Sequence, residues 1–433
     1  GHVQAPETIV AGVQALEPGS YLDYQNGTLS GGRFEQWQNK ETARDLDQMR
    51  SLFTQAASRH LIADTPVAVF LSGGIDSSAV VAAASQAGVA KISTLTLAFP
   101  DYPEYSEDEA ALLVAEKYAT DHGVVPMSAS QIEACLTEAL EAMDQPTVDG
   151  INTYLIAKAA KDAGFKVALS GLGGDELFGG YISFKDVPKM MKLKDRFSFV
   201  PPQLVSALGS LDPHGKTLNK IVDMAEAPND VVSLYLCRRR IFTSYQTDKL
   251  LLPELASGRW LADVCPTRLN FAQELCRGRS VADAISRLEI SFYMEQMLLR
   301  DSDVMGMANS LEIRLPMLDR QFAAAALALP SATRIVNPPS KELLREMVRP
   351  WLPAGIMDRP KQGFVLPFER WLRGPLKDRM ESGLSQVDQH SGLQLKAISD
   401  TWRRFLLSPG GTDWVRPWSL FVLVHYLEKH GLR

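Results

Sequence analysis

Cysteine is scarce in this chain. Four cysteines occur among 433 residues, and no two have the C-x-x-C spacing of a zinc or redox site: Cys135, Cys237, Cys265 and Cys276. The sequence therefore predicts neither a disulfide framework nor a zinc centre. Buried thiols in a reducing compartment are expected, which favours a cytoplasmic location.

Long apolar runs and an excess of basic charge are also lacking. No apolar run reaches the length of about 18 residues that a membrane-spanning helix needs, so the sequence predicts no membrane protein. Lys and Arg total 45 and Asp and Glu total 51, which gives a net charge of -6. The sequence therefore lacks the excess of basic residues that is typical of proteins that bind nucleic acid or acidic membranes. The hydrophobic content of 45% is ordinary for a globular protein.

One glycine- and serine-rich segment stands out. Leu71-Ser72-Gly73-Gly74-Ile75-Asp76-Ser77-Ser78 follows a short apolar run, Val67–Phe70, that is typical of a buried parallel strand, and residues 79–87 are predicted to be helical. A strand-to-helix turn in an α/β sheet binds anions, because free backbone N–H groups and the helix dipole point at the ligand. The Lys-Ser/Thr pair of a Walker A loop is missing, so the loop belongs to a different class.

A second glycine-rich segment follows another predicted strand, at 166–170. It contains Gly171-Leu172-Gly173-Gly174-Asp175-Glu176, whose glycines allow close approach of the backbone to a ligand and whose acids offer hard oxygen ligands. Parallel strands end at the same edge of a sheet. Asp76 and Asp175 are therefore predicted to lie near each other at that edge, where two carboxylates could share one Mg²⁺ ion.

The first loop resembles the pyrophosphate loop of the ATP pyrophosphatases, and both loops together resemble the synthetase domain of the asparagine synthetase family. Three further segments extend the likeness. Residues 310–319 (SLEIRLPMLD) are similar to the family's SLE-x-R-x-P-x-x-D, 341–345 (KELLR) to K-x-x-L-R, and 359–364 (RPKQGF) to R-x-K-x-x-F. The five motifs occur in the family's order and cover most of residues 60–375.

The resemblance implies an ATP-dependent ligase that uses ATP and Mg²⁺. A carboxylate attacks the α-phosphate, pyrophosphate leaves, and a nitrogen nucleophile displaces AMP from the acyl-adenylate. Asp76, Asp175 and Lys361 are the implied catalytic residues, with Asp76 and Asp175 as metal ligands. Lys361 lies at the family's catalytic Lys position, where a fixed cation stabilises developing charge.

The resemblance also implies a set of nucleotide contacts. These are Leu71, Ser72, Gly73, Gly74, Asp76, Ser77, Ser78, Leu97, Ser170, Gly171 and Gly173. Leu97 is included because adenine lies across strand ends in such sheets. Arg300, Asp303 and Glu312 are candidates either for organising the site from the helical side or for structural ion pairs.

The substrate side departs from the family pattern. Asparagine synthetases carry an acid between the first two glycines of the second loop, where it could accept a proton from ammonium; here that position is Leu172. Residues 144–154 contain no Arg to pair with an α-carboxylate. Asp149, Asn152 and Thr153 would suit an amine or sugar hydroxyls better, so the acceptor is predicted to differ from aspartate. The alternative is that Leu172 packs while another acid serves.

The predicted fold is α/β. Apolar runs at 66–71, 92–99, about 122–126 and 166–170 alternate with helical stretches, which indicates a parallel, doubly wound sheet of the ATP pyrophosphatase type. A large helical C-terminal region follows, and its last helix, at 418–427, is apolar all round and expected to be buried.

Two domains are expected. Residues 1–38 look like the last strands of the family's glutamine-hydrolysing domain, and 39–433 form the synthetase domain, with a nucleotide core at about 60–185 and a helical part at about 186–433. The sequence starts at Gly1, without an initiator Met and without the N-terminal Cys that the family's glutaminase uses as nucleophile. It is therefore expected to begin inside a larger protein.

Three functions remain open at this point. The first is an amide ligase that acts on a small-molecule carboxylate and takes ammonia from glutamine through a glutaminase domain outside this chain. The second is an intramolecular ring closer, similar to β-lactam synthetases or lasso-peptide cyclases. The third, a non-catalytic ATP-binding module, would not require Asp76, Asp175 and Lys361 together. The sequence leaves a homodimer open.

Overall fold

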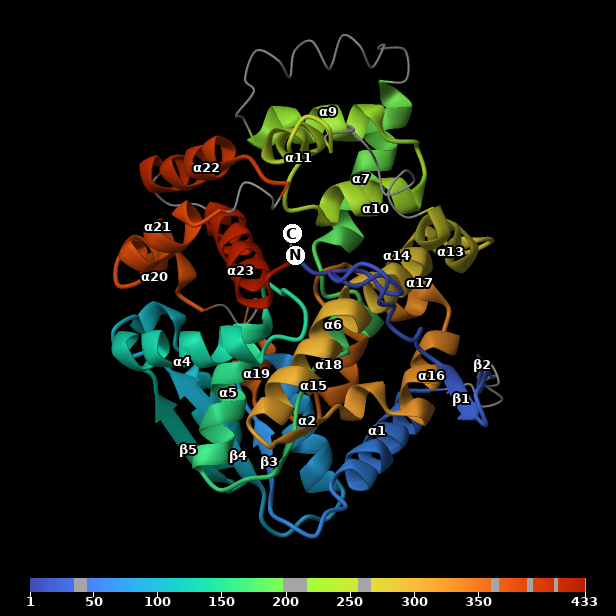
Figure 1. Cartoon of the computed structure of the whole chain (residues 1–433). Coiled ribbons are helices and arrows are strands. Elements are labelled where there is room, and N and C mark those ends of the chain that lie inside the picture. Colours follow the sequence, from blue (N-terminus) through green and yellow to red (C-terminus); the bar gives the residue numbers. More distant parts are fainter. Residues whose placement is uncertain are drawn as a thin grey trace.

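The computed structural model describes residues 1–34, 45–197, 216–255, 266–359, 366–387, 392–408 and 412–432. Figure 1 shows a twisted sheet wrapped by helices in the lower half of the molecule and a purely helical part above it. The predicted α/β class with a large helical region is confirmed. Lys361 and Cys265 lie outside the described residues.

The central sheet has five strands, all parallel, in the order β5-β4-β3-β6-β7. The strands are β3 (Val67–Phe70), β4 (Ser93–Ala98), β5 (Asp121–Pro126), β6 (Val167–Leu169) and β7 (Glu312–Arg314). The four predicted apolar runs are confirmed as β3 to β6. β7 was not predicted, because this short edge strand carries two charged residues among its three and lacks an apolar run.

Strand order reverses beside β3. From β3 the chain moves outward to β4 and β5, then returns to place β6 on the other side of β3, with Val67 opposite Val167 and Val69 opposite Leu169. In open α/β sheets ligands bind at such a switch point, beyond the carboxyl ends of the two strands. Both glycine-rich loops begin there, one after β3 and the other after β6.

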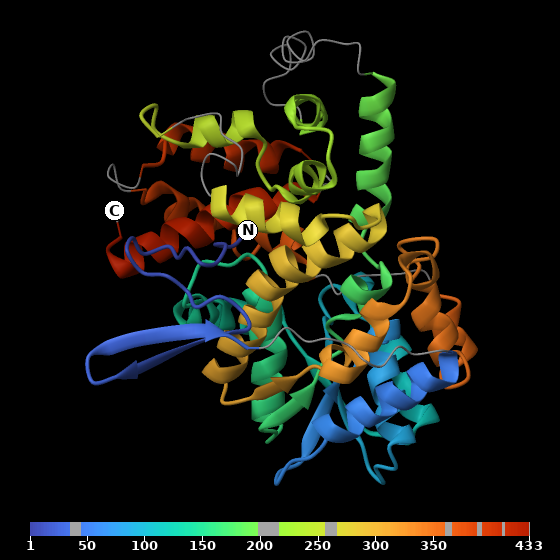
Figure 2. The ribbon, with the colours of Figure 1, turned by 90° about the vertical axis from the view of Figure 1, so that its right-hand side faces the viewer.

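Helices cover both faces of the sheet (Figures 1 and 2). On one face, α1 (Leu46–His60), α2 (Ile75–Gln86) and α3 (Asp108–Lys117) share a core with Val69 and Leu169. On the other, the alanines of α5 (Gly150–Asp162) pack on Ala68 and Ala168, and α15 (Leu299–Ala308) lies against α5 and β7. Small residues on both sides let α5 approach β3 and β6 closely, which sets one wall beside the switch point.

The remaining helices build the rest of the chain, and most of them stack above the sheet (Figure 2). Their bounds are α4 (Ala129–Ala142), α6 (Gly174–Phe178), α7 (Ser183–Arg196), α9 (Lys216–Glu226), α10 (Val231–Arg239), α11 (Ser244–Leu250), α13 (Pro266–Cys276), α14 (Val281–Leu288), the π-helical η2 (Glu289–Leu298), α16 (Arg320–Ala328), α17 (Ser331–Arg334), α18 (Glu342–Val348), α19 (Ala354–Met357), α20 (Phe368–Arg373), α21 (Lys377–Ser385), α22 (Leu395–Leu407) and α23 (Val415–His430). Single 3-10 turns occur at η1 (Pro103–Tyr105), η3 (Pro316–Leu318) and η4 (Thr412–Trp414). The predicted burial of the last helix is confirmed, since Trp418 in α23 is 0% exposed.

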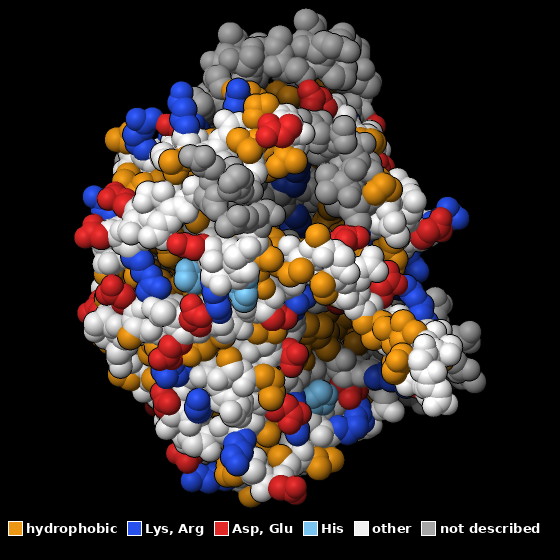
Figure 3. Space-filling model, viewed as in Figure 1, with side chains coloured by type: hydrophobic (Ala, Val, Ile, Leu, Met, Phe, Trp, Pro, Cys, Tyr) orange, Lys and Arg blue, Asp and Glu red, His pale blue; other side chains and the backbone are white. Residues whose placement is uncertain are grey.

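The N-terminal residues form a separate antiparallel hairpin, β1 (Ser20–Gln25) and β2 (Thr28–Arg33). Its apolar side chains include Leu22, Tyr24 and Leu29, all exposed (Figure 3, right). The segment before the hairpin is anchored to the body: the Ala5 N–H donates to Gln296 Oε1 at 2.8 Å. The hairpin agrees with the strands expected in residues 1–38, while their glutaminase origin stays a prediction.

The surface shown in Figure 3 agrees with the near balance of acidic and basic residues in the sequence. Acidic and basic side chains are mixed over the face in Figure 3, without a large patch of one sign. Among the described helices, none combines the length and the apolar character that a bilayer crossing needs.

Candidate active site

The first loop holds its own shape through two serines. Ser77 Oγ accepts a hydrogen bond from the Ser72 N–H at 3.2 Å and donates to the Gly74 carbonyl at 3.1 Å. Helix α2 begins directly after Gly74 and has no side-chain cap, so its first N–H groups lack a capping side chain. The loop therefore presents a fixed set of donors at a helix N-terminus, which is an anion-binding arrangement.

Glycine is required where the two loops meet. A Cβ on Gly171 would lie 2.8 Å from both the Asp76 carbonyl carbon and the Ser77 nitrogen, which are backbone atoms that cannot yield easily. Gly73 has a φ of +73°, and a Cβ there would lie 2.8 Å from the Ala111 nitrogen. The second loop is thus pressed against the start of α2, and the ends of β3 and β6 form one continuous surface.

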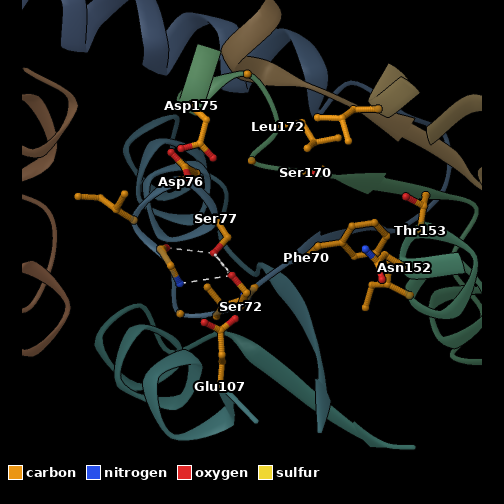
Figure 4. A pocket seen from close by; sticks show the side chains of 18 of the residues that line it. Phe70, Ser72, Asp76, Ser77, Glu107, Asn152, Thr153, Ser170, Leu172 and Asp175 are labelled. Carbon is orange, nitrogen blue, oxygen red and sulfur yellow. Dashed lines mark hydrogen bonds between the residues drawn. The ribbon is translucent and has the colours of Figure 1, made fainter. Parts of the chain in front are cut away.

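The two predicted metal ligands come together on one cation. Lys341 Nζ donates to Asp76 Oδ2 and lies 2.8 Å from Asp175 Oδ1. Figure 4 shows the carboxylates of Asp76 and Asp175 pointing toward each other from the two loops. Burial alone would lower the pKa of the Lys341 ammonium, but the two carboxylates outweigh it and raise that pKa above its usual value.

A cleft of about 410 Å³ opens between these loops and the helical part. One half, called the loop half, is formed by the pair of glycine-rich loops with Lys341, Arg345 and Arg359, and strand β4 supplies Leu95, Thr96 and Leu97. Its other half is lined by α5, η2 and Leu172. The cationic side chains among the described lining residues lie on the loop half, together with the acids Asp76, Asp175 and Glu107, whereas the far half carries Asp149 without a cationic lining residue in the described part of the chain.

The far half of the cleft combines apolar and acidic groups. Leu172 packs against the buried cluster Met294, Met297 and Leu298 of η2. Asn152 and Thr153 lie beside Phe70 in Figure 4. Asp149, the residue before α5, accepts a hydrogen bond from Asn152 Nδ2 at 2.5 Å. Burial raises the pKa of Asp149 to about 6, against a lowering contribution from Asn152.

A further acid, Glu107, lies under the first loop. In Figure 4 its side chain points up at Ser72. Burial raises the pKa of Glu107 to about 7, while Arg359 acts in the opposite direction. Sequence analysis did not single this residue out, because an acid just before a helix is usually a solvated partner of the helix dipole.

Most predicted site residues line this one cleft. They are Leu71, Ser72, Gly73, Gly74, Asp76, Ser77, Leu97, Asp149, Asn152, Thr153, Ser170, Gly171, Leu172, Gly173 and Asp175. Ser78 differs: it is 0% exposed within α2 and does not line the cleft, so a direct contact with pyrophosphate would require the helix start to move. Lys361 falls outside the described residues.

The three candidates on the helical side do not line the cleft. Arg300 forms a two-pronged pair with Asp144, at 3.0 and 2.6 Å. Glu312 pairs with Arg314 at 2.9 Å, and Asp303 is exposed. Of the two roles proposed for them, the structural ion pair fits Arg300 and Glu312.

Sequence reasoning missed Lys341, Tyr181 and Tyr293 as cleft residues. Lys341 opens the K-x-x-L-R segment, which carried the family resemblance but suggested no role. Tyr181 holds the buried Glu176 by donating to Oε1 at 2.7 Å. Arg239 lies over the rings of both tyrosines, with its guanidinium carbon 4.7 Å and 3.9 Å from the centroids of Tyr181 and Tyr293.

Comparison with known proteins agrees with this geometry. The asparagine synthase family matches residues 48–427. Asparagine synthetase [glutamine-hydrolyzing] 1 of Bacillus subtilis is 27% identical over 410 residues, which cover 92% of this chain and 63% of the relative. A Mycobacterium tuberculosis protein named as a candidate glutamine-hydrolysing asparagine synthetase is 28% identical over 386 residues, covering 86% of this chain and 57% of the relative.

A third relative, asparagine synthetase B [glutamine-hydrolyzing] of Escherichia coli, is 26% identical over 204 residues, covering 42% of this chain and 36% of the relative. The chain spans about three fifths of the length of the Bacillus and Mycobacterium relatives. With the family match covering most of its residues, the chain belongs to the asparagine synthase family.

Proposed function

We propose that this protein is an ATP-dependent, amide-forming ligase that adenylates a carboxylate and transfers nitrogen to it. The observation that carries the proposal is the meeting of Asp76, Asp175 and the Ser72–Ser77 loop at the switch point between β3 and β6. A pyrophosphate group needs donors and a cationic partner: the loop offers the donors, and a metal ion held by Asp76 and Asp175 would be the cationic partner. Membership of the asparagine synthase family supports the same chemistry.

The residues present fit ATP and Mg²⁺. The point between Asp76 and Asp175 already accepts a cation, because Lys341 Nζ contacts both carboxylates. No group of three or more metal-binding side chains occurs in the described part of the chain, so an ion here would take two protein carboxylates and complete its shell with phosphate oxygens and water. When bound, Mg²⁺ neutralises phosphate charge and favours the departure of pyrophosphate.

The chain's own residues then divide the work. Ser72, Gly74 and the start of α2 would hold the leaving pyrophosphate, and Leu97 would contact the adenosine. Lys341 would keep the carboxylates in place, while Lys361 would stabilise charge on the α-phosphate and the acyl oxygen. Glycines at 73 and 171 let the two loops pack closely on α3 and on the start of α2, where a Cβ would collide with backbone.

The nitrogen source and the remaining partners follow from the relatives. The names of these relatives describe them as glutamine-hydrolysing. We propose that ammonia reaches this chain from a glutaminase domain of which residues 1–38 are the last part. Ring closure on a substrate's own amine is the second candidate, favoured by the absence of an acid at Leu172. A cytoplasmic location is proposed because the few cysteines suggest buried thiols in a reducing compartment, and a homodimer stays open.

The first test is the nucleotide product and the acceptor. We expect wild-type protein to convert ATP to AMP and pyrophosphate, and aspartate with ammonium to give little or no asparagine. The reason is that the cationic lining residues lie on the loop half of the cleft, whereas Asp149 in the far half would repel an α-carboxylate. A pyrophosphate-release screen over carboxylic acids, with chromatography of the nucleotide, measures both.

Two results would contradict this proposal. ADP as the sole nucleotide product would rule out adenylation. Efficient asparagine formation, with a KM for aspartate in the usual range up to about 1 mM, would show that the acceptor is aspartate and that Leu172 is a packing residue only. Release of pyrophosphate by an amine-bearing acid without ammonium would favour ring closure.

Replacement of Lys361 by alanine provides a second test. We expect kcat to fall by about 10²-fold or more, the effect of losing a group that stabilises charge in the transition state. Lys361→Arg should also be impaired, because a planar guanidinium does not replace a compact ammonium in a closed site. Steady-state kinetics beside equilibrium ATP binding separates the roles: weaker ATP binding at full kcat would make Lys361 a binding residue.

A further inference from the structure

The cleft offers five acidic side chains that could serve the nitrogen-transfer step: Asp76, Glu107, Asp149, Asp175 and Glu176. Four of them are committed elsewhere. Asp76 and Asp175 share the Lys341 ammonium. Glu176 is 1% exposed and held by Tyr181, and Glu107 lies under the pyrophosphate loop. Asp149 is the one that faces the far half of the cleft.

Asp149 lies in the neighbourhood of the acid that Leu172 replaces. Val148, the residue before it, and Leu172 both pack on the cluster Met294, Met297 and Leu298. Asp149 and Leu172 also line the same cleft. The two loops that carry them therefore meet at the same part of η2. The Asp149 carboxylate can then accept a proton near the position where Leu172 provides no carboxylate.

The carboxylate of Asp149 has no cationic partner among the described residues. Its one hydrogen bond from a side chain comes from Asn152. Although it occupies the position before α5, it makes no capping hydrogen bond to the helix. The titratable groups that face it are Asp301 of α15, a like charge when ionised, and Tyr293 of η2. Such a group costs stability and provides no structural contact that an asparagine could not provide.

We propose that Asp149 is the catalytic proton acceptor for the nitrogen nucleophile, an ammonium ion or a primary amine, in place of the carboxylate missing at Leu172. The proposal rests on the proposed function. The ammonium transfers a proton to the Asp149 carboxylate, and the nitrogen lone pair forms a bond to the acyl carbon. The bond from that carbon to the AMP oxygen breaks, and its electron pair leaves with AMP. The nitrogen, positively charged after the attack, loses a second proton to water, which gives the neutral amide, and Asp149 releases its own proton to solvent.

The first experiment separates proton transfer from adenylation. Asp149→Asn is compared with wild type, using ammonium chloride or hydroxylamine as nucleophile and the carboxylate that gives most pyrophosphate in the screen. Hydroxylamine is already unprotonated at neutral pH and does not need the same base. We expect amide formation from ammonium to fall by about 10²-fold or more, the usual contribution of a general base, while hydroxamate formation changes far less.

Asp144→Asn is the matched control. Asp144 lies on the same loop, does not line the cleft, and pairs with Arg300 at the surface. This variant should treat both nucleophiles as wild type does. Equal losses with both nucleophiles in Asp149→Asn, or no loss, would overturn the proposal, since they indicate a binding or structural role.

The second experiment is independent of the acceptor. Because burial places the pKa of Asp149 at about 6, above its ordinary value of 3.8, the folded state favours the neutral acid and ionisation lowers stability as pH rises through this interval. Asp149→Asn should therefore melt at a higher temperature than wild type at pH 8, and the difference should vanish near pH 4.

These melting curves keep the two proposals apart. A lower melting temperature for Asp149→Asn at pH 8 would show that the carboxylate stabilises the fold, which overturns its assignment as a group kept for chemistry. If none of the carboxylates in the screen makes the wild-type protein release pyrophosphate, the proposed function fails. The melting comparison then still tests whether the Asp149 carboxylate destabilises the fold.

Discussion

Replacing Asp76 or Asp175 by asparagine is expected to abolish Mg²⁺-dependent turnover while the fold survives. Asp76 lies in the first turn of α2 and Asp175 in the first turn of α6, the helices that follow the loops after β3 and β6. Their side chains are 23% and 24% exposed, and both contact the same cation. Asparagine keeps the size of the side chain and removes the charge. A metal bound through two carboxylates would lose half of its protein ligands in either variant.

The expected loss of kcat is about 10²- to 10³-fold for each variant, as for removal of one electrostatic stabiliser in a closed site. Calorimetric titration with ATP at limiting Mg²⁺ gives a second measurement that does not depend on the acceptor. Asp303→Asn is the matched control, since Asp303 is exposed on α15 and does not line the cleft. Near wild-type activity of either site variant at limiting Mg²⁺ would disprove a shared metal.

The sequence predicted those parts of the fold that depend on local patterns of apolar and loop-forming residues. The strands β3, β4 and β6 are short apolar runs bounded by loop residues, so their burial and parallel pairing could be inferred. β7 was missed because an edge strand with the sequence Glu312-Ile313-Arg314 has too little apolar character to stand out. Its position depends on pairing with β6, which is a long-range contact.

In the candidate site, too, local sequence patterns predicted some residues, whereas others depend on long-range contacts. Loops that bind through backbone groups need glycines and serines at fixed spacing, and these were visible at 71–78 and 171–176. Lys341 lies 265 positions after Asp76, and no local pattern joins the two. Its placement depends on how α18 packs beside α2 and α6, which only the folded chain specifies.

Asp149 shows what structure adds to a residue already suspected. The sequence placed it on the substrate side because residues 144–154 take the place of the family's substrate-binding segment. The lack of a cationic partner in the described part of the chain, and the shared packing of Val148 and Leu172 on η2, are properties of the tertiary structure. These two properties are the basis for proposing that Asp149 accepts a proton from the nitrogen nucleophile.

Lys341→Met is expected to have the largest effect on stability. The Lys341 side chain is 3% exposed, and its ammonium neutralises two carboxylates that face each other. Its backbone is held in the left-handed region, at a φ of +53°, directly before α18. The Gly180 position approaches both Lys341 and Asp175 so closely that a Cβ would collide with them, so the cation has little freedom to move.

Methionine fills a similar volume without the charge and leaves the two carboxylates repelling each other. Removing one partner of a buried ion pair costs about 3 to 5 kcal/mol. Because water still reaches Asp76 and Asp175, the expected loss in the free energy of unfolding lies near the lower end, about 3 kcal/mol. Chemical denaturation measures it, with Lys429→Met as the control: Lys429 pairs with Glu141 at the surface, where about 0 to 1 kcal/mol is expected.

The same variant also tests whether Mg²⁺ binds to the carboxylates that Lys341 contacts. If Lys341 and the metal use the same carboxylates, Mg²⁺ binds the folded Lys341→Met variant more tightly than the wild type, because the competing ammonium is gone. Binding to the folded state alone raises stability by mass action, so added MgCl₂ should raise the melting temperature of the variant more than that of the wild type. Equal shifts would place the metal elsewhere, and an unchanged stability without metal would mean that the Lys341 pairs contribute no more than surface ion pairs do.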